Sequence, residues 1–365
     1  MALLGHSGSQ APQLMHSSVI RMAMSAFVLL HKDTAPLMDS RLQTLENLAA
    51  ELRTLTLQED LLARTAAKNP WFTPEFSKKS LESWAHALRP EALAHWAARY
   101  GSPANASSKT VGVLCAGNLP LVGLHDILMS YLAGWNVIYK ASSDDAVLLP
   151  AVIERLRAMD TQASIQPVER LTSIDALLAT GSNNTLRYFA HYFSEVPHVL
   201  RGSRTSVAVL QGAESDQELD GLAADIFQYF GRGCRSITHL FLPQDFDVQR
   251  LFASWLPWGH LAQHAKYGSN YDYHRALFML NKEPFLENNF VLLREHPALK
   301  PPVGVIHYTW YTDIAEVEAR LQEEYANIQV RMGAGQTISF GQSQAPELWD
   351  FSDGLDTYTF LMENA

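Results

Sequence analysis

Cysteine is scarce in this sequence, and no stretch concentrates Lys and Arg. Two cysteines, Cys115 and Cys234, occur in 365 residues, and they form no Cys-x-x-Cys pair. A chain of this length can bury a core without a disulfide bond, so we expect two free thiols and a cytoplasmic protein. A formal net charge of −10 disfavours nucleic acid as a partner, because phosphate contacts require clustered Lys and Arg.

Long apolar runs and several catalytic motifs are also missing. No apolar stretch approaches the roughly 20 residues that cross a bilayer, so we expect no membrane span. The 14 histidines form no His-Glu-x-x-His pattern, which disfavours a metal site. No Gly-x-Ser-x-Gly motif is present, which disfavours a serine hydrolase. With 47% hydrophobic and 18% charged residues, the chain has the composition of an ordinary globular enzyme.

The first hundred residues predict a tail followed by helices. Residues 1–18 are polar and without pattern, and we expect a disordered tail there. Between residues 20 and 100, apolar side chains recur at helical spacing. The segment Asn-Pro-Trp-Phe-Thr-Pro at 69–74 interrupts this pattern, because two prolines cannot lie inside one helix. Thr73 is expected to cap the next helix, with Pro74 as its first residue.

From residue 110 the pattern changes to alternating strands and helices. Short apolar runs rich in β-branched residues predict strands at 110–115, 135–139, 174–179, 206–210, 237–242, 290–293 and 303–308. The segments between them predict helices at 121–132, 148–159, 186–193, 222–230 and 314–325. Strands separated by helices of this length require parallel crossovers, so we expect an α/β fold with a doubly wound sheet.

The segment Gly-Arg-Gly-Cys-Arg-Ser at 231–236 is the first candidate for chemistry. Small residues on both sides of Cys234 leave its thiol unshielded. Arg232 and Arg235 are expected to lower the thiol pKa and thereby favour the nucleophilic thiolate. A buried structural cysteine is the alternative interpretation.

Three further candidates follow predicted strands. The Asn118 amide can donate a hydrogen bond to an oxyanion, or it can cap the helix that follows. Gly181 and Ser182 precede a predicted helix, whose free N–H groups suit a pyrophosphate, although a simple helix cap is the alternative. Lys140 ends a strand, where it can hold a ribose or its phosphate or remain a solvated surface charge.

Taken together, these segments resemble one known family. The stretches at 69–74, 115–143, 179–185, 231–236 and 341–350 resemble, in the same order, the bacterial acyl-CoA reductase family that includes the fatty-acid reductase supplying aldehyde to bacterial luciferase. The likeness extends over about residues 20–362. That family belongs to the aldehyde dehydrogenase superfamily.

The resemblance implies an aldehyde-dehydrogenase-like fold with two domains. The helical N-terminal region and a Rossmann-type NAD(P)-binding domain would occupy residues 19–204. An α/β catalytic domain carrying the nucleophilic cysteine would occupy residues 205–340. The segment 341–365 would form an interface or return to the cofactor domain. Homo-oligomers are common in the superfamily, and enzymes that transfer acyl groups are conceivable partners.

The resemblance also implies roles for individual residues. Cys234 would be the nucleophile, and the Asn118 amide would form the oxyanion hole with the Cys234 backbone N–H. The implied cofactor residues are Lys140 and Ser142 at the adenosine ribose, Gly181 and Ser182 at the pyrophosphate, and Glu295 at the nicotinamide ribose. Lys140 and Ser142 leave room for a 2′-phosphate, which favours NADPH over NADH.

The implied activity is NAD(P)H-dependent reduction of an acyl-CoA thioester to the aldehyde, through an acyl-enzyme and with coenzyme A as part of the substrate. Hydrolytic aldehyde dehydrogenases carry a Glu-Leu-Gly-Gly-Lys motif that supplies the base for water. The corresponding stretch here is Leu-Arg-Gly-Ser-Arg at 200–204, without a carboxylate. This departure favours coenzyme A over water as the acyl partner. The alternatives are a coenzyme A-independent aldehyde dehydrogenase and a non-catalytic binding or scaffold protein.

Overall fold

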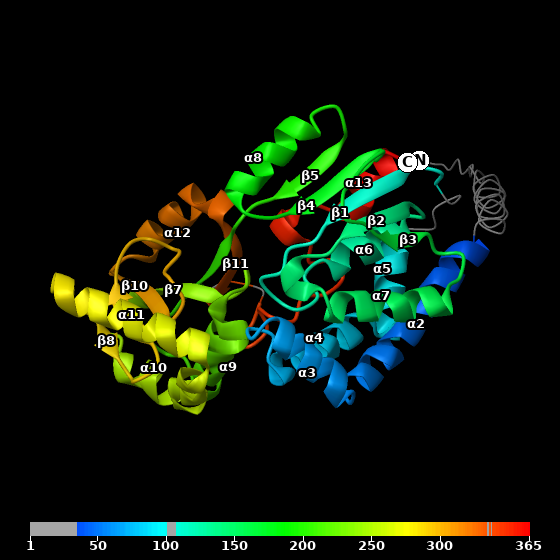
Figure 1. Cartoon of the computed structure of the whole chain (residues 1–365). Coiled ribbons are helices and arrows are strands. Elements are labelled where there is room, and N and C mark those ends of the chain that lie inside the picture. The colour runs from blue at the N-terminus through cyan, green and yellow to red at the C-terminus, as the bar shows by residue number, and fades with distance from the viewer. Residues whose placement is uncertain (1–34, 101–106, 334–335, 337) are drawn as a thin grey trace, which may run out of the picture.

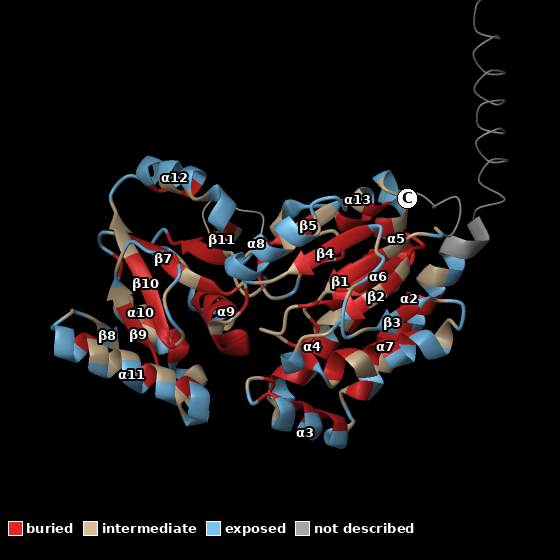
Figure 2. Ribbon diagram, turned by 45° about the horizontal axis from the view of Figure 1, so that its top comes forward, coloured by how far each residue is buried: buried red, intermediate tan, exposed pale blue. Residues whose placement is uncertain are grey.

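The computed structural model describes residues 35–100, 107–333, 336 and 338–365 (Figure 1). The tail expected at residues 1–18 lies outside these ranges. The described chain forms two lobes, each built around one sheet with helices packed against it (Figure 1). Strands of both sheets are largely buried, whereas the outer faces of α3, α11 and α12 are exposed (Figure 2).

The N-terminal helices pack on the first lobe as the apolar spacing predicts. They are α2 (Ala35–Leu55), α3 (Glu59–Lys68), α4 (Pro74–Ala87) and α5 (Pro90–Tyr100). The predicted cap of α4 is confirmed, since the Thr73 hydroxyl accepts a hydrogen bond from the Phe76 N–H at 3.2 Å and Pro74 is the first helical residue. Apolar side chains of α2, α4 and α5 join one core with those of the first sheet.

The first sheet is parallel throughout, in the order β3-β2-β1-β4-β5. Its strands are β1 (Thr110–Leu114), β2 (Asn136–Lys140), β3 (Ile165–Pro167), β4 (Ala176–Thr180) and β5 (His198–Arg201). The connecting helices are α6 (Leu124–Leu132), α7 (Leu148–Met159) and α8 (Asn183–Tyr192). The strand order reverses between β1 and β4, and such a switch point is where open α/β sheets bind ligands, beyond the carboxyl ends of the strands.

The second sheet has the order β11-β6-β7-β10-β9-β8, and its strands are parallel except for β8. They are β6 (Thr205–Val209), β7 (Ile237–Pro243), β8 (Leu286–Glu287), β9 (Leu292–Glu295), β10 (Val305–Tyr311) and β11 (Ile328–Gly333). The helices of this lobe are α9 (Asp216–Phe227), α10 (Val248–Trp255), α11 (Ala265–Asn281) and α12 (Ile314–Glu323). The predicted α/β class with parallel sheets is therefore confirmed.

The end of the chain returns to the first lobe. Helix α13 (Thr357–Glu363) packs against α6, and it lies beside β1 and β4 in Figure 1. Leu348, Phe351, Tyr358 and Leu361 join the same core as the N-terminal helices. The first sheet thus completes its core with residues that follow the whole second sheet in sequence.

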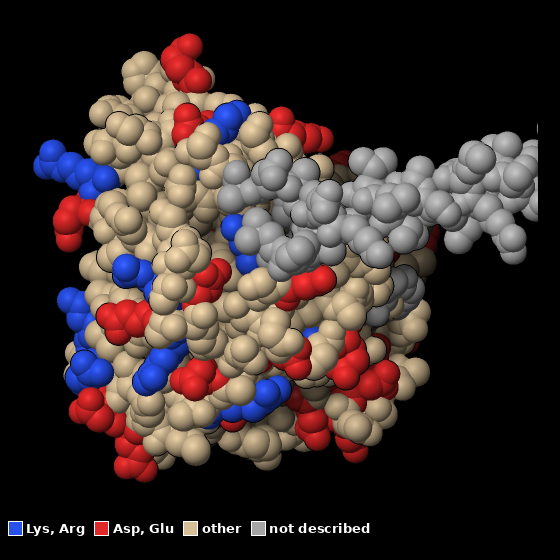
Figure 3. Space-filling model, turned by 90° about the vertical axis from the view of Figure 1, so that its right-hand side faces the viewer, with Lys and Arg blue, Asp and Glu red and all other residues tan. Residues whose placement is uncertain are grey.

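The described part of the chain has no helix suited to a membrane, and the face seen in Figure 3 has no basic patch. Among the helices of the described residues, none combines the length and the apolarity needed to cross a bilayer. On the face seen in Figure 3, Lys and Arg alternate with Asp and Glu instead of gathering in one patch.

Two buried histidines on adjacent strands make the second lobe sensitive to acid. His239 of β7 is 0% exposed and His307 of β10 is 4% exposed, and each donates from Nδ1 to the Ala298 carbonyl. Burial, with the charge of Arg320 second, lowers the pKa of His239 to about 3. Burial likewise lowers the pKa of His307 to about 4.

We therefore expect the free energy of unfolding to fall as the pH drops below about 6.5, the ordinary histidine pKa. The unfolded imidazoles bind protons in that range and the folded ones do not, so acid favours the unfolded chain. For His239 the loss amounts to roughly 3 kcal/mol between about pH 6.5 and about pH 4. Urea unfolding at several pH values measures it.

The variant His239→Gln should show a smaller difference in unfolding free energy between neutral and acid pH than the wild type. His260 lies on the surface, and His260→Gln should keep the full wild-type difference. If the unfolding free energy of His239→Gln falls between neutral and acid pH as much as that of the wild type, His239 is not the cause of the acid sensitivity.

Candidate active site

Cys234 lies in a loop whose approach is conformationally unusual. Helix α9 leads into a short 3-10 turn, η2 (Gln228–Gly231), in which Tyr229 has φ 56°, Phe230 φ 60° and Gly231 φ 68°. Left-handed backbone is uncommon for aromatic residues and costs about 1–3 kcal/mol at each, so the surrounding packing must hold it. Both aromatic side chains are buried in the core of the second lobe. The loop before the cysteine is therefore firmly anchored.

The thiol of Cys234 is half-buried and free, and Cys115 is also free, as expected from the sequence. Burial raises the pKa of the Cys234 thiol, and the positive charge of Arg235 only partly opposes this. The expectation that the flanking arginines give the thiol a lowered pKa is therefore wrong in its net direction. Desolvation outweighs the one nearby cation, while the Arg232 guanidinium lies over the Trp71 ring, 4.5 Å from its centroid.

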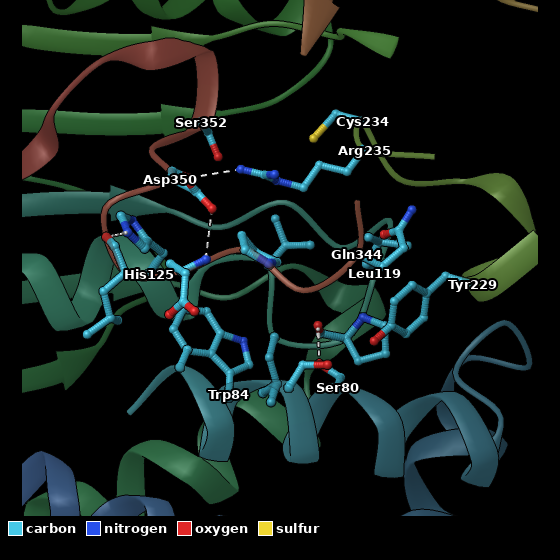
Figure 4. Close-up of a pocket in the computed structure, with 18 residues that line it drawn as sticks. Ser80, Trp84, Leu119, His125, Tyr229, Cys234, Arg235, Gln344, Asp350 and Ser352 are labelled. Atoms are coloured by element: carbon cyan, nitrogen blue, oxygen red, sulfur yellow. Dashed lines mark hydrogen bonds between the residues drawn. The ribbon is translucent and has the colours of Figure 1, made fainter. Parts of the chain in front are cut away.

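Cys234 opens onto a pocket of about 160 Å³ between the two lobes (Figure 4). Most of its walls are apolar, and they come from Trp84, Leu119, Leu121, Val122, Tyr229 and Leu348. In Figure 4, Cys234 and Arg235 occupy one side of the pocket, and Ser80 and Trp84 of α4 occupy another. The pocket is thus built from α4, the turn after β1, the cysteine loop and the C-terminal segment.

The two carboxylates that line this pocket are already engaged. Glu347 accepts two hydrogen bonds from the Arg89 guanidinium, at 2.7 and 2.9 Å. Asp350 accepts from the Glu347 backbone N–H at 2.9 Å. The Asp350 backbone carbonyl in turn accepts from the Arg235 guanidinium at 3.0 Å, which ties the C-terminal segment to the cysteine loop.

Asn118 lies beside the cysteine loop, as the candidate oxyanion role requires. It follows β1, and its Nδ2 donates to the Arg232 carbonyl at 3.1 Å. The turn that carries it is held by Asp145, whose carboxylate accepts from the backbone N–H groups of Leu121 at 2.8 Å and Leu149 at 3.2 Å. The structure therefore brings Asn118 and the loop of Cys234 together across the lobes.

The four candidate cofactor residues of the first lobe meet at one edge of its sheet. Lys140 ends β2, where it is paired with Leu114 of β1, and Ser142 follows it. Gly181 and Ser182 follow β4, and the Ser182 hydroxyl caps α8 by accepting from Thr185 N–H at 3.3 Å. This is the edge at the switch point between β1 and β4.

The structure does not place Glu295 near the carboxyl ends of β2 and β4. It ends β9 in the second lobe, where it is paired with Tyr308, and its side chain is exposed. Cys234 precedes the amino end of β7, whereas Glu295 lies at the carboxyl end of a strand in the same parallel arrangement. Among the candidate residues, Glu295 alone lies apart from the cysteine loop and the switch point.

A buried ion pair between Arg201 and Asp126 lies behind the pocket, and neither residue was among the predicted site residues. Arg201 is 2% exposed and forms an ion pair with Asp126 of α6 at 2.8 Å. It also donates to the Thr357 hydroxyl at 2.6 Å and to the Ser352 carbonyl at 3.4 Å. A sequence signal for it exists, since Asp126 is the one carboxylate in the otherwise apolar stretch LHDILMSYL of α6.

Comparison with known proteins supports this picture of the fold. No curated protein sequence matches the chain. Among solved structures, aldehyde dehydrogenase 21 from Physcomitrella patens, in complex with succinate, matches over 97% of this chain and 89% of its own, with a TM-score of 0.64 and 13% identity. An aldehyde dehydrogenase of Mycobacterium tuberculosis in complex with NAD⁺ matches over 79% of this chain and 71% of its own, with a TM-score of 0.58 and 14% identity.

The chain also matches the bifunctional proline utilization A protein over 90% of its own length, with a TM-score of 0.60 and 16% identity, but it spans only 38% of that protein. These likenesses confirm the aldehyde-dehydrogenase-like fold. Residues 51–257, more than half of the chain, match the family model described as acyl-CoA reductase (LuxC). The protein is therefore a member of the LuxC acyl-CoA reductase family, a family of oxidoreductases, and it has the fold of the aldehyde dehydrogenases.

Proposed function

We propose that this protein reduces an acyl-CoA thioester to the aldehyde with NAD(P)H, through an acyl group carried on Cys234. The observation that carries the proposal is a free thiol that opens onto an apolar pocket, with the Asn118 amide beside its loop. A thiol, a hydrogen-bond donor and an apolar chamber are what transfer of a fatty acyl group requires.

The pocket suits the hydrocarbon part of the substrate. A cavity of about 150 Å³ accommodates a molecule the size of benzene, so about 160 Å³ has room for roughly six carbon atoms. Of the charged side chains that line the pocket, Glu347 is paired with Arg89, and Arg235 lies at the cysteine loop and donates to the Asp350 carbonyl. We therefore infer an unsubstituted acyl chain of about six carbons as the group that the pocket holds best.

In the proposed reaction, the Cys234 thiol gives its proton to solvent and its sulfur attacks the thioester carbonyl carbon. The Arg235 charge favours the thiolate. The oxyanion receives hydrogen bonds from the Asn118 amide and the Cys234 backbone N–H, and such donors contribute about 3 kcal/mol each. The carbon–sulfur bond to coenzyme A then breaks, and coenzyme A leaves as a thiolate that takes up a proton. This leaves an acyl-enzyme on Cys234.

The residues at the switch point fit a nicotinamide dinucleotide. A Cβ placed on Gly181 would meet the Thr185 side chain at 3.8 Å, an ordinary van der Waals contact, so the chain's own packing does not require glycine there. Ser182 caps α8, whose first turn carries no acidic side chain, and its N–H groups suit a diphosphate. Lys140 is exposed at the end of β2, where it suits a ribose or a 2′-phosphate. We favour NADPH over NADH for this reason.

When bound, the cofactor supplies the hydride that reduces the acyl-enzyme carbonyl. The resulting thiohemiacetal on Cys234 collapses, the bond between its carbon and the sulfur breaks, and aldehyde leaves. We assign cofactor binding to residues 19–204 and the catalytic cysteine to residues 205–340, in keeping with the lobes on which the two groups of residues lie.

Oxidation of aldehyde to free acid is the second candidate, and the surroundings of Cys234 disfavour it. The stretch 200–204 contributes Arg201 to a buried ion pair and no carboxylate. The two carboxylates that line the pocket, Glu347 and Asp350, both accept hydrogen bonds within the chain. Asp353, whose charge also acts on Cys234, is paired with Arg204 at 3.1 Å. These three carboxylates are thus all engaged within the chain and none is a free base for water, which supports exchange with a thiol.

The test is a spectrophotometric assay of NADPH and NADH consumption with acyl-CoA thioesters of graded length. We expect consumption that depends on the thioester, with kcat/KM rising up to about six carbons. A parallel assay follows reduction of NADP⁺ by aldehyde, with and without coenzyme A. NADP⁺ reduction by aldehyde without coenzyme A, at a rate equal to that with it, would favour the second candidate. No consumption with any thioester would overturn the proposal.

A further inference from the structure

Two cations share one indole ring close to the cysteine loop. The guanidinium carbon of Arg232 lies 4.5 Å from the centroid of the Trp71 ring, and the ammonium nitrogen of Lys266 lies 5.9 Å from the same centroid. Both distances fall within the range of a cation–π contact. Arg232 comes from the segment before Cys234, Trp71 from the segment before α4, and Lys266 from the first turn of α11.

No carboxylate of the described residues neutralises this pair. Neither cation takes part in an ion pair there. The Nη1 atom of Arg232 is buried and has no hydrogen-bond partner in the described chain. The first turn of α11 carries no acidic side chain. Asp144 acts on Arg232 only through its longer-range charge, and its own side chain is exposed.

His264 lies beside this pair of cations and makes its hydrogen bonds to the backbone. His264 stacks near Trp71, with ring centroids 5.1 Å apart. Its Nε2 donates to the Pro70 carbonyl at 2.8 Å, and its Nδ1 accepts from the Tyr267 N–H at 3.3 Å. Both ring nitrogens therefore already have partners within the chain. The site therefore has two positive charges over one aromatic ring, and the exposed Lys266 ammonium is open to an anion from solvent.

The cluster lies within reach of the reaction proposed above. Arg232 is two residues from Cys234, a separation of at most about 7 Å along the backbone. Its carbonyl already accepts from Asn118. Coenzyme A and the nicotinamide dinucleotide each carry a diphosphate some distance from their reacting atom, and phosphate oxygens are the acceptors that suit Arg and Lys.

We propose that Arg232 and Lys266, over the Trp71 ring, bind a phosphate or diphosphate group of the acyl-CoA substrate. This inference rests on the proposed function, because it names the part of a coenzyme that this site holds. The dinucleotide carries the same phosphate chemistry, but its phosphates are assigned above to the start of α8 and to Lys140, and kinetics separate the two coenzymes.

The experiment compares the wild type with Lys266→Gln and Arg232→Gln. Each is assayed with an acyl-CoA and with the same acyl group on N-acetylcysteamine, which carries no phosphate. Loss of one charge-assisted contact should raise the KM of the phosphate-bearing coenzyme roughly tenfold. The KM of the N-acetylcysteamine thioester should stay unchanged. The matched control is Arg99→Gln, since Arg99 lies over the Tyr100 ring at 5.3 Å and on the surface.

The outcomes separate the sources. A rise in KM for acyl-CoA with no change for NADPH assigns the phosphate to the acyl donor. The reverse would place the dinucleotide at this cluster and overturn the assignment to acyl-CoA. Equal changes with the phosphate-free thioester, or a fall in kcat alone, would show a purely structural role and overturn the proposal. An unchanged KM for both coenzymes in Lys266→Gln would also overturn the proposal.

Failure of the proposed function is distinguishable from failure of this site. If the wild type reduces no thioester, calorimetric titration with inorganic pyrophosphate tests the site directly. Binding that Lys266→Gln and Arg232→Gln each weaken roughly tenfold, and that Arg99→Gln leaves intact, supports the site. Equal binding in the wild type and all three variants refutes it.

Discussion

Replacement of Cys234 by alanine is expected to lower acyl-CoA-dependent NADPH consumption at least about a thousandfold, because the acyl-enzyme can no longer form. NADPH binding, followed by the fluorescence of the reduced nicotinamide, should remain close to that of the wild type. The residues proposed to hold the cofactor lie at the ends of β2 and β4, on the other lobe. The loss should therefore appear in kcat and in the acyl-enzyme trapped on the protein, and not in cofactor affinity.

Cys115 provides the matched control. It is the other free thiol, it is 9% exposed at the end of β1, and burial, with the charge of Asp126 second, raises its pKa strongly. Such a thiol is inert as a nucleophile. Cys115→Ala should keep kcat within about twofold of the wild type, since the change removes one small buried group. Turnover that survives in Cys234→Ala would exclude the covalent route.

Replacement of Arg201 by methionine is expected to cost about 3–5 kcal/mol of unfolding free energy, because the Asp126 carboxylate would stay buried without its partner. Burial has the largest single effect on the pKa of Asp126 and raises it. The Arg201 charge, the next largest effect, lowers it, and the pKa of Asp126 stays below its ordinary value. Urea denaturation followed by circular dichroism measures the change. The same substitution frees the Ser352 carbonyl at the pocket wall, so KM for acyl-CoA should rise as well.

Two further variants show whether the buried pair causes this loss. The double variant Arg201→Met/Asp126→Leu should recover much of the stability, because it leaves no unpaired buried charge. Arg155 and Glu51 form an exposed pair at 3.7 Å, and Arg155→Met should cost less than about 1 kcal/mol. If Arg201→Met lowers the unfolding free energy no more than Arg155→Met does, the buried pair of Arg201 and Asp126 does not stabilise the fold as expected.

Elements with strong local signals were predictable from the sequence. Helix α7 runs over residues 148–159, the predicted range, because its apolar spacing is regular. The Thr73 cap was equally readable, since capping depends on neighbours in the chain. By contrast, no strand was predicted at β3, which has three residues, or at β5, which overlaps the stretch 200–204 only at its last two residues. Both lie at the edges of the sheet and are only partly buried, so they lack the apolar run that marks a central strand.

The candidate site was predictable only in part. The resemblance to a family linked Asn118 with Cys234, and the structure places the Asn118 amide against the cysteine loop. The thiol pKa was predicted in the wrong direction, because the arginines are visible in the sequence and the desolvation is not. The pocket wall formed by the C-terminal segment depends on Arg201, which contacts residues about 150 positions away. Contacts between residues so far apart in the sequence produce no local pattern from which they could be predicted.

The return of the chain end to the first lobe has a consequence for biosynthesis. Tyr358 and Leu361 fill the core of a sheet whose last strand ends at Arg201, and the entire second sheet is made in between. A ribosome adds about 5–20 residues per second, so the first lobe waits for roughly 10–30 seconds with part of its core uncovered. During that time the unfinished lobe is the part of the nascent protein most in need of a chaperone. A slow stretch of codons within the second sheet would prolong this exposure, and one placed before β1 would not.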